Sequence, residues 1–197
     1  MKRPFRRHPE RHQRGQSLVE FALVFPIFFV LLMGLIEFGL VFNALLSINF
    51  ASRDASLIAA EAGNAVGSDC VILKKVEDSI GAPASTSRVT EVRIYNADKN
   101  GNQIGGQVNV YARSGSTPCT LPSGAWTAPY SLTTSGYLET NRCNIQAGCS
   151  GSGGVDTIGV KITYRHSWVT PLPGLVSLGG SGATFVQSNA MRMEPVL

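Results

Sequence analysis

The residues that most often carry enzyme chemistry are few in this sequence and widely spaced. Two of the three histidines, His8 and His12, lie in the first fifteen residues, so His166 is the one histidine in the body of the chain. It continues the apolar side of an alternating segment, where a lone histidine is more often a core or rim residue than a base. The sequence has no Gly-x-Ser-x-Gly, His-Glu-x-x-His or phosphate-binding glycine motif. We therefore expect a protein that is not an enzyme and needs no cofactor.

One segment has the side chains of a cation site but not their spacing. Asp98, Asn100 and Asn102 alternate as at the start of a calcium-binding loop, with Gly101 between them. In such a loop the glycine comes later and a glutamate closes the site, and both features are missing here. These residues are also turn formers, so the segment predicts a hairpin loop and no metal site.

The longest feature of the sequence is an apolar run near its N-terminus. Apart from glycine and proline, positions 18–46 contain three residues that are not apolar: Glu20, Glu37 and Asn43. As a helix, 18–36 is roughly 28 Å long, about the thickness of the hydrocarbon layer of a bilayer. A core helix of a soluble protein is rarely this long, and a cleaved secretory signal has an apolar region of only about 7 to 15 residues. We expect a transmembrane helix at 16–46.

Basic residues precede this run and set its expected orientation. Six of the 17 Lys and Arg residues lie in the first fifteen positions, whereas the rest of the chain has 11 basic and 12 acidic residues. Because the body of the protein is nearly neutral, we do not expect nucleic-acid binding through a basic surface. Positive residues are retained on the cytoplasmic side of a membrane. We therefore expect a basic cytoplasmic leader at 1–15 and a periplasmic part after the span.

The boundary between leader and apolar run has a recognisable order of residues. The Gly15–Gln16 bond follows the basic residues, and Glu20 would be the fifth residue of a chain that starts at Gln16. This order resembles the type IV prepilin signal, in which a peptidase cuts after the glycine. The resemblance implies that Glu20 meets the new amino group of a neighbouring subunit, since a carboxylate in a low-dielectric bundle is costly unless it is paired. Without processing, Glu20 would lie at the membrane surface, where the helix dipole favours it.

Three segments of the chain carry a narrower resemblance. They are Gly15–Pro26, Gly34–Gly39 and Asn49–Ala55, and together they are similar to the TadE-like family. Members of that family are minor pilins or pseudopilins of the tight-adherence (Flp) pilus and secretion system. The resemblance covers roughly residues 14–60 and implies a role in pilus assembly. Arg53 matches the family motif, but the sequence assigns it no chemistry.

Two residues of the apolar helix are candidates for a role in assembly. Pro26 removes a backbone hydrogen bond to Ala22, which predicts an ordinary kink or a point where the helix loosens when the subunit leaves the membrane. Glu37 is expected near the outer membrane surface. There it either snorkels to water or pairs with a neighbouring subunit, and snorkelling is the slightly favoured expectation.

The helix is expected to continue beyond the membrane over 47–66. Small and aliphatic residues recur there with steps of three and four, at Ala44, Ile48, Ala51, Ala55, Ile58 and Ala62. Such a seam packs closely against another helix or against the chain's own sheet, and the sheet is slightly favoured. Gly63 and Asn64 are suited to end the helix.

The remaining residues, 67–197, predict an exterior α+β domain. A second helix is expected at 69–80. Four antiparallel strands are expected at Arg88–Tyr95, Gln107–Ala112, Thr157–Trp168 and Ala183–Met193, with a long loop, 96–106, between the first two. Residues 114–154, rich in Gly, Ser, Thr and Pro, predict an irregular insertion on the surface. The expected fold class is α+β and pilin-like, with a long N-terminal helix packed on a small antiparallel sheet.

Four cysteines lie in this exterior domain: Cys70, Cys119, Cys143 and Cys149. Outside the cytoplasm they are expected to form disulfides, and four cysteines allow three pairings. Short loop closure weakly favours Cys143 with Cys149, which leaves Cys70 with Cys119. No Cys-x-x-Cys pair supports a zinc site.

These features lead to two hypotheses about function. In the first, the protein is a minor pilin or pseudopilin whose leader is cleaved after Gly15 and whose helix packs with other subunits. Its expected partners are a prepilin peptidase, other pilin or pseudopilin subunits, an inner-membrane assembly platform and membrane lipid. It is expected in the bacterial inner membrane, and incorporation into an extracellular pilus stays open. In the second, the span is a tether and the insertion, with Trp126, Tyr130 and Tyr137, is an adhesion module that binds a surface or a sugar.

Overall fold

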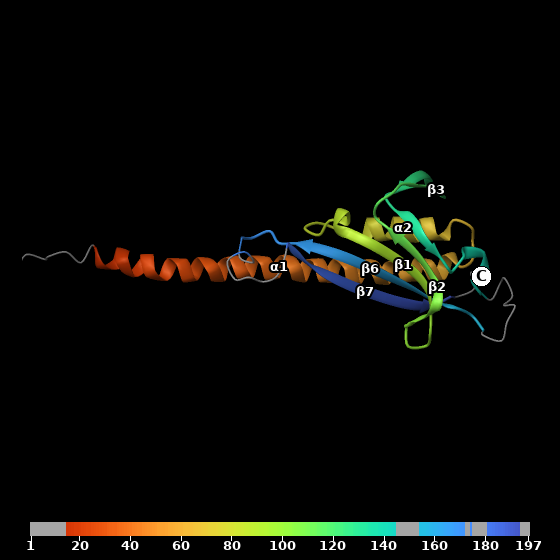
Figure 1. Ribbon diagram of the computed structural model, residues 1–197, viewed down its shortest axis with the longest axis horizontal. Coiled ribbons are helices and arrows are strands. Elements are labelled where there is room, and N and C mark those ends of the chain that lie inside the picture. Colours follow the sequence, from red (N-terminus) through yellow and green to blue (C-terminus); the bar gives the residue numbers. More distant parts are fainter. Residues whose placement is uncertain (1–14, 145–153, 172–173, 175–180, 194–197) are drawn as a thin grey trace, which may run out of the picture.

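The computed structural model describes residues 15–144, 154–171, 174 and 181–193, and it shows a long helix that carries a small domain along its C-terminal half (Figure 1). Helix α1 (Gln16–Ala62) has 47 residues, and α2 (Ser68–Ser79) follows it. The α+β class expected from the sequence is confirmed. The expected leader, apart from Gly15, lies outside the described residues.

Five antiparallel strands form the main sheet, in the order β5-β2-β1-β6-β7. They are β1 (Val89–Ala97), β2 (Gln103–Ala112), β5 (Ser131–Ser135), β6 (Thr157–Ser167) and β7 (Gly182–Arg192). The four expected strands are all present, and a short 3-10 helix, η1 (Thr86–Arg88), precedes the first of them. The expectation of a four-stranded sheet is wrong by one strand, because β5 pairs with β2 at one edge.

The insertion at 114–154 has more regular structure than the sequence predicts. In its described part, β3 (Thr117–Leu121) and β4 (Gly124–Ala128) form a separate two-stranded sheet. Strand β5 and a 3-10 helix, η2 (Glu139–Asn141), follow. Composition does not identify these strands because Ser and Thr occur in turns as well as in strands, and packing decides between the two.

The hairpin between β1 and β2 is tighter than expected. Its connection is 98–102, whereas the sequence predicted a long loop at 96–106. The Asp98 carboxylate closes the turn by accepting backbone N–H bonds from Asn100 and Asn102, at 2.8 and 2.9 Å. The Asn102 N–H, followed by the other donors of the loop, lowers the pKa of the Asp98 carboxyl. Within the described residues, no cluster of His, Cys, Asp and Glu side chains is arranged to hold a metal ion.

The core lies between one face of the sheet and the C-terminal half of α1. The seam residues Ala44, Ile48, Ala51, Ala55 and Ala59 are almost completely buried, and this part of α1 contacts β6 and β7. Opposite them, alternate residues of β6 are fully buried: Ile158, Val160, Ile162 and Tyr164. The alanines allow the helix axis to approach the sheet closely, so the seam packs on the chain's own sheet. Toward its C-terminal end the buried line passes through Ala59 instead of Ile58.

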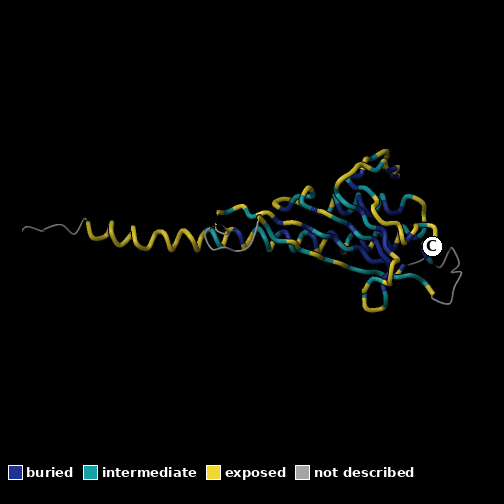
Figure 2. Tube along the Cα trace, in the orientation of Figure 1, coloured by how far each residue is buried: buried dark blue, intermediate teal, exposed yellow. Residues whose placement is uncertain are grey.

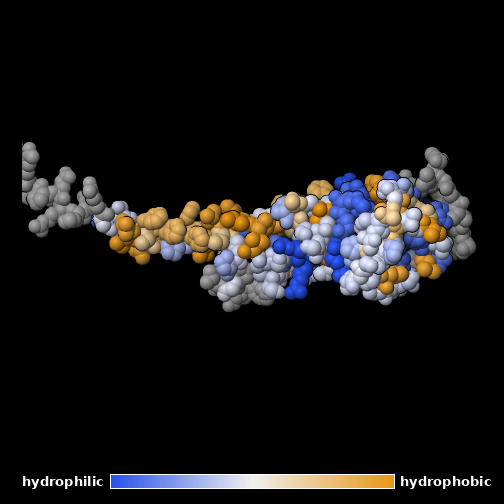
Figure 3. Space-filling view, turned by 90° about the horizontal axis from the view of Figure 1, so that it is seen from above, coloured by the Kyte–Doolittle hydropathy of each residue, from blue (hydrophilic) through white to orange (hydrophobic). Residues whose placement is uncertain are grey.

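The N-terminal half of α1 has no covering within the described chain (Figure 2). Every residue from 15 to 32 is exposed, and the helix is long and apolar enough to cross a membrane. The helix continues through Pro26 without interruption. In Figure 3 this half is a column of apolar residues that leads into the more polar domain. Because soluble proteins rarely expose an apolar surface of this size, the segment is suited to membrane anchoring.

The C-terminal end of α1 matches the expected stop signal. Gly63 has a positive φ of 59° and donates its N–H to the carbonyl oxygen of Ala59 at 3.3 Å. A Cβ at this position would lie 2.6 Å from Nδ2 of Asn144. Glycine is therefore required here both by the backbone conformation and by the close approach of the insertion.

Candidate assembly helix and its anchors

The residues of the expected processing site lie together at the free end of α1. Gly15 is the N-cap residue, Gln16 is the first helical residue, and both are exposed. The Gln16 side chain donates from Nε2 to Oε1 of Glu20 at 3.1 Å, one helical turn away. Glu20 is exposed, and within the described part of the chain its carboxylate forms no ion pair. A carboxylate at the head of an apolar helix is thus accessible to a cation on another molecule.

Glu37 is buried where α1 meets the domain, which corrects the expectation that it snorkels to water. Its carboxylate accepts a hydrogen bond from Nε2 of His166 at 3.0 Å. It also accepts bonds from the backbone N–H groups of Val169 and Thr170, at 3.2 and 2.8 Å. All three donors come from the end of β6 and the residues after it. Since a buried carboxylate is stable only when it is paired, these bonds fix the height and rotation of α1 against the sheet.

His166 lies on the buried side of β6, as the alternation of the sequence indicates. It is 1% exposed, and its ring packs against Trp168 and Phe185 at centroid distances of 5.6 and 6.4 Å. With Nε2 directed at Glu37, His166 serves as an anchor for α1. A lone carboxylate in an apolar helix and a lone histidine at a strand end are each costly to bury alone. The sequence therefore indicates that each residue needs a partner, but not that they are partners of each other.

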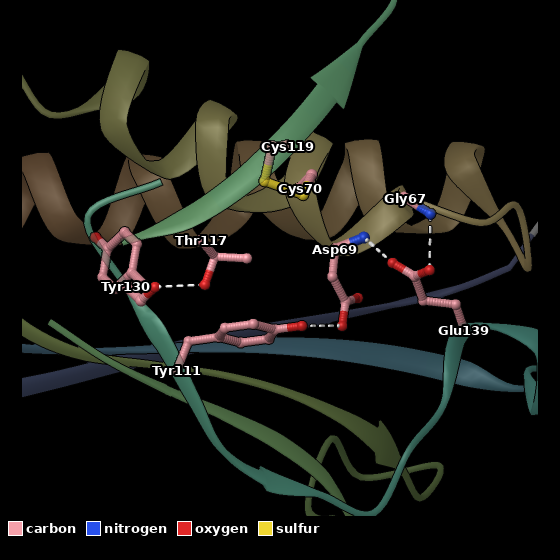
Figure 4. The surroundings of a disulfide bond; sticks show 8 residues. All are labelled: Gly67, Asp69, Cys70, Tyr111, Thr117, Cys119, Tyr130 and Glu139. Atoms are coloured by element: carbon pink, nitrogen blue, oxygen red, sulfur yellow. Dashed lines mark hydrogen bonds between the residues drawn. A yellow bond between two sulfur atoms is a disulfide. The ribbon is translucent and has the colours of Figure 1, made fainter. Parts of the chain in front are cut away.

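A disulfide joins α2 to β3 (Figure 4). It links Cys70 to Cys119 with a Cα–Cα distance of 5.7 Å, which is the pairing left by the loop-closure argument. Cys143 is also disulfide-bonded, and Cys149 lies outside the described residues. The first bond fastens the β3–β4 hairpin to the helix next to α1.

Beneath this disulfide lies a buried polar cluster that the sequence analysis missed. The Arg142 side chain is fully buried and forms an ion pair with Asp69. The second oxygen of Asp69 accepts hydrogen bonds from the Tyr111 hydroxyl at 2.7 Å and from Nδ2 of Asn109 at 2.8 Å. Burial, and then the neighbouring Asp69 carboxylate, raise the pKa of Tyr111 far above its usual value. A cluster with this many mutual bonds stabilises packing and leaves little capacity for chemistry.

The same cluster caps the start of α2 from another part of the chain. Glu139, in η2, accepts the backbone N–H groups of Gly67 and Asp69, both at 2.7 Å (Figure 4). These groups have no partner within the helix, and a negative charge at a helix N-terminus is favoured by the dipole. The described part of the insertion is therefore held by a covalent bond, an ion pair and a helix cap.

The aromatic residues of the insertion do not form an exposed binding surface. Tyr130 and Tyr137 are 0% and 4% exposed, and their hydroxyl groups donate to Glu77 and Asp156, at 2.5 and 2.9 Å. Trp126 is half-buried against the domain. Two of the three residues that motivated the adhesion hypothesis are therefore core residues, and the structure does not support that motivation.

Comparison with known protein families gives a match over part of α1. Residues 15–57 match the family model described as TadE-like protein. This is the part of α1 that carries the junction, the exposed apolar segment, Glu37 and most of the buried seam. No curated protein and no solved structure shows significant similarity to the chain.

Proposed function

Since residues 15–57 form a TadE-like segment, we propose that this protein is a prepilin-type minor pilin or pseudopilin that takes part in assembly of a tight-adherence (Flp) pilus. The observation that carries the proposal is the exposed apolar half of α1, headed by Gly15, Gln16 and Glu20. A prepilin peptidase removes the basic leader after Gly15. The helix then anchors the subunit in the bacterial inner membrane, with its start on the cytoplasmic side and the domain in the periplasm.

Assembly requires the apolar helix to exchange lipid for the helices of other subunits. That exchange has little hydrophobic driving force, because lipid tails are as apolar as the side chains they replace. Close packing and the few polar groups of the helix therefore decide which subunits associate and in what register. Glu20 is such a group: its partner, the Gln16 amide, is neutral and exposed, and the amino group of a neighbouring subunit can replace it with a charge-assisted bond.

We also propose that the protein has no catalytic activity and binds no cofactor. The buried carboxylates of the described residues are paired with basic side chains, Asp69 with Arg142 and Glu37 with His166. Such pairs position α1, α2 and the insertion for subunit contacts. The assembly platform of the inner membrane is then the partner that receives the anchored subunit.

Processing is tested by expressing the full chain with and without a prepilin peptidase. The mature protein should begin at Gln16, as read by N-terminal sequencing and by the loss of mass of residues 1–15. Gly15→Val should stay uncut, because the peptidase recognises the glycine before the bond. An unchanged mass of the native sequence in the presence of an active peptidase would contradict the proposal.

The role of Glu20 is tested separately from processing. Glu20→Ala should stay in the membrane, because the apolar segment is unchanged, but pilus assembly should fall. Asp78→Ala is a matched control, since it removes an exposed carboxylate that pairs with Lys74 on the surface of α2. Equal assembly by both variants would remove the proposed role of Glu20.

A further inference from the structure

A cavity of about 200 Å³ lies where the domain meets α1 near the exposed half of that helix. Its lining includes Leu40 of α1, Ala84 and Arg88 from the segment that follows α2, and His166 and Val169 from the end of β6 and just beyond it. Figure 1 shows β6 running toward the exposed half of α1, so this is the end of the domain nearest the apolar segment. Three distant parts of the chain therefore enclose one small space.

The position of the cavity along α1 corresponds to the lipid headgroups of a membrane. As a helix, 18–36 spans roughly 28 Å, and Leu40 lies four residues, or about 6 Å, farther along. A bilayer has a headgroup layer about 5–8 Å thick on each side of its hydrocarbon core. Val169 and Phe38, which are 60% and 67% exposed, leave apolar surface open at this end of the domain. The cavity therefore lies at headgroup height when α1 spans the membrane.

Arg88 is the cation that lines this cavity. Its side chain is half-buried, and within the described part of the chain it forms no ion pair or hydrogen bond. Arg165, near the end of β6, donates to a neutral hydroxyl group. The carboxylates nearby are already bonded, since Glu37 accepts from the end of β6 and Glu91 of β1 lies 2.6 Å from Arg93. This end of the domain thus has positive charge that the described residues do not neutralise.

Two buried polar atoms at the same place have no hydrogen-bond partner in the described chain. His166 uses Nε2 for Glu37, whereas its Nδ1 is unpartnered. Nε1 of Trp168, whose ring packs against that of His166, is unpartnered too. Buried polar atoms are nearly always paired, and an indole N–H can only donate. These atoms favour a partner from outside the chain that offers acceptor oxygens.

We propose that this cavity binds the headgroup of an anionic phospholipid from the membrane leaflet next to the domain. The lipid phosphate supplies a negative charge for Arg88 and acceptor oxygens for the buried donors, and its acyl chains lie along the exposed apolar half of α1. The cavity is smaller than the roughly 300–1,000 Å³ of sites for drug-sized ligands, so it fits a headgroup and not a whole lipid. The inference rests on the proposed function, because it requires α1 to anchor the chain in a membrane.

The fluorescence of Trp168 tests binding directly. The chain has two tryptophans, so Trp126→Phe leaves Trp168 as the reporter beside the cavity. The full chain in detergent micelles is titrated with short-chain phosphatidylglycerol, which should change the Trp168 emission to saturation. Short-chain phosphatidylcholine has a phosphate but no net charge, and it should bind roughly fivefold more weakly or less. Equal affinities, or no saturable change, would overturn the anionic headgroup site.

Two variants locate the site. Arg88→Gln should weaken phosphatidylglycerol binding roughly fivefold, whereas Lys99→Gln, on the exposed hairpin loop, is the matched control and should leave it unchanged. Both variants keep the basic leader, so its contribution is the same. Ala84→Leu adds side-chain volume at a position that is 8% exposed, and should reduce binding without any change of charge. If Arg88→Gln matches Lys99→Gln, or if folded Ala84→Leu binds as the native chain does, the cavity is not the site.

Free phosphate carries the same charge chemistry as the lipid, so the source is tested separately. Inorganic phosphate, titrated in the same way, should bind at least tenfold more weakly than phosphatidylglycerol, because it has no acyl chains to bury against α1. In vesicles, backbone amides of 84–88 should exchange hydrogen more slowly in phosphatidylglycerol than in phosphatidylcholine. Phosphate that binds as tightly as the lipid, or exchange that is equal in the two kinds of vesicle, would overturn a membrane lipid as the ligand.

The outcomes separate this inference from the proposed function. Correct processing and pilus assembly by a chain that does not distinguish the two lipids overturn the headgroup site and leave the minor pilin proposal standing. Selective binding of phosphatidylglycerol by a chain that is neither processed nor needed for a pilus supports the site and overturns the proposed function.

Discussion

The anchor between Glu37 and the end of β6 is testable by replacing Glu37 with alanine. The change leaves three donors without their acceptor: Nε2 of His166 and the N–H groups of Val169 and Thr170. A buried donor that loses its partner costs about 1–3 kcal/mol. Val169 is 60% exposed, so water replaces part of the loss. We expect Glu37→Ala to weaken the docking of α1 on β6 by about 3 kcal/mol.

The assay is hydrogen exchange of the full chain in detergent, followed at backbone amides of 164–167. These amides belong to the end of β6, which pairs with β7, and they do not bond to Glu37, so they report docking and not the lost bonds themselves. A loss of about 3 kcal/mol predicts exchange about 150-fold faster. Glu37→Gln keeps the shape and one acceptor oxygen, and should cost about 1 kcal/mol, or about fivefold.

Asp78→Ala is the control, because it removes a carboxylate that is 54% exposed on α2. It should leave exchange at 164–167 unchanged. If Glu37→Ala also leaves these amides unchanged, the carboxylate does not hold α1 to the sheet. The three bonds would then be a consequence of docking by the buried seam and not one of its causes.

Three further predictions concern the stability of the domain. Gly159→Ala should lower the free energy of urea unfolding of the domain by about 1–3 kcal/mol, because a Cβ at this position would lie 2.3 Å from the Tyr95 ring. Tyr95→Ala in the same chain should relieve part of this loss, and a double variant whose loss equals the sum of the two single losses would contradict the clash. Replacing Cys70 and Cys119 together by alanine should lower the free energy of unfolding by about 2–4 kcal/mol, since the disulfide closes a loop with a sequence separation of 49. An unchanged free energy of unfolding in urea would refute this stabilising role. Burial and the Asp69 carboxylate raise the pKa of Tyr111 above its usual value of 10.0. The stability that this hydroxyl contributes is therefore complete below about pH 10 and is lost as the pH rises above that value. The free energy of unfolding, measured between about pH 7 and pH 11, should fall less for Tyr111→Phe than for the native sequence.

The sequence was informative where one property repeats along a single element. The apolar run, the stop at Gly63 and the alternation in 157–168 predicted α1, its end and strand β6, because each depends on neighbouring residues. The junction at Gly15 and Glu20 is equally local, since both residues lie within two turns at the head of one helix. The four main strands were also expected near their observed positions.

Local patterns did not reveal the contacts that depend on distant parts of the chain. Glu37 and His166 are 129 residues apart, and nothing near either residue names its partner. Arg142 occurs in a segment whose composition indicates a surface loop, yet its side chain is fully buried against Asp69. The strands β3, β4 and β5 were missed because packing decides whether such residues form strands. Strand β5 pairs with β2, whereas β3 and β4 pair with each other and the disulfide joins β3 to α2.

The sequence by itself determined that this chain has an apolar helix with a carboxylate at its head, followed by an exterior domain. It did not determine which side of that helix faces the domain, because the small residues and the larger apolar residues, such as Phe42, Phe50 and Leu57, both recur with a helical repeat. The tertiary structure decided this by packing the alanine seam on β6 and β7, where small side chains permit close approach. Burial of that seam leaves the larger apolar residues, among them Phe42, Phe50 and Leu57, exposed on the opposite side of the helix.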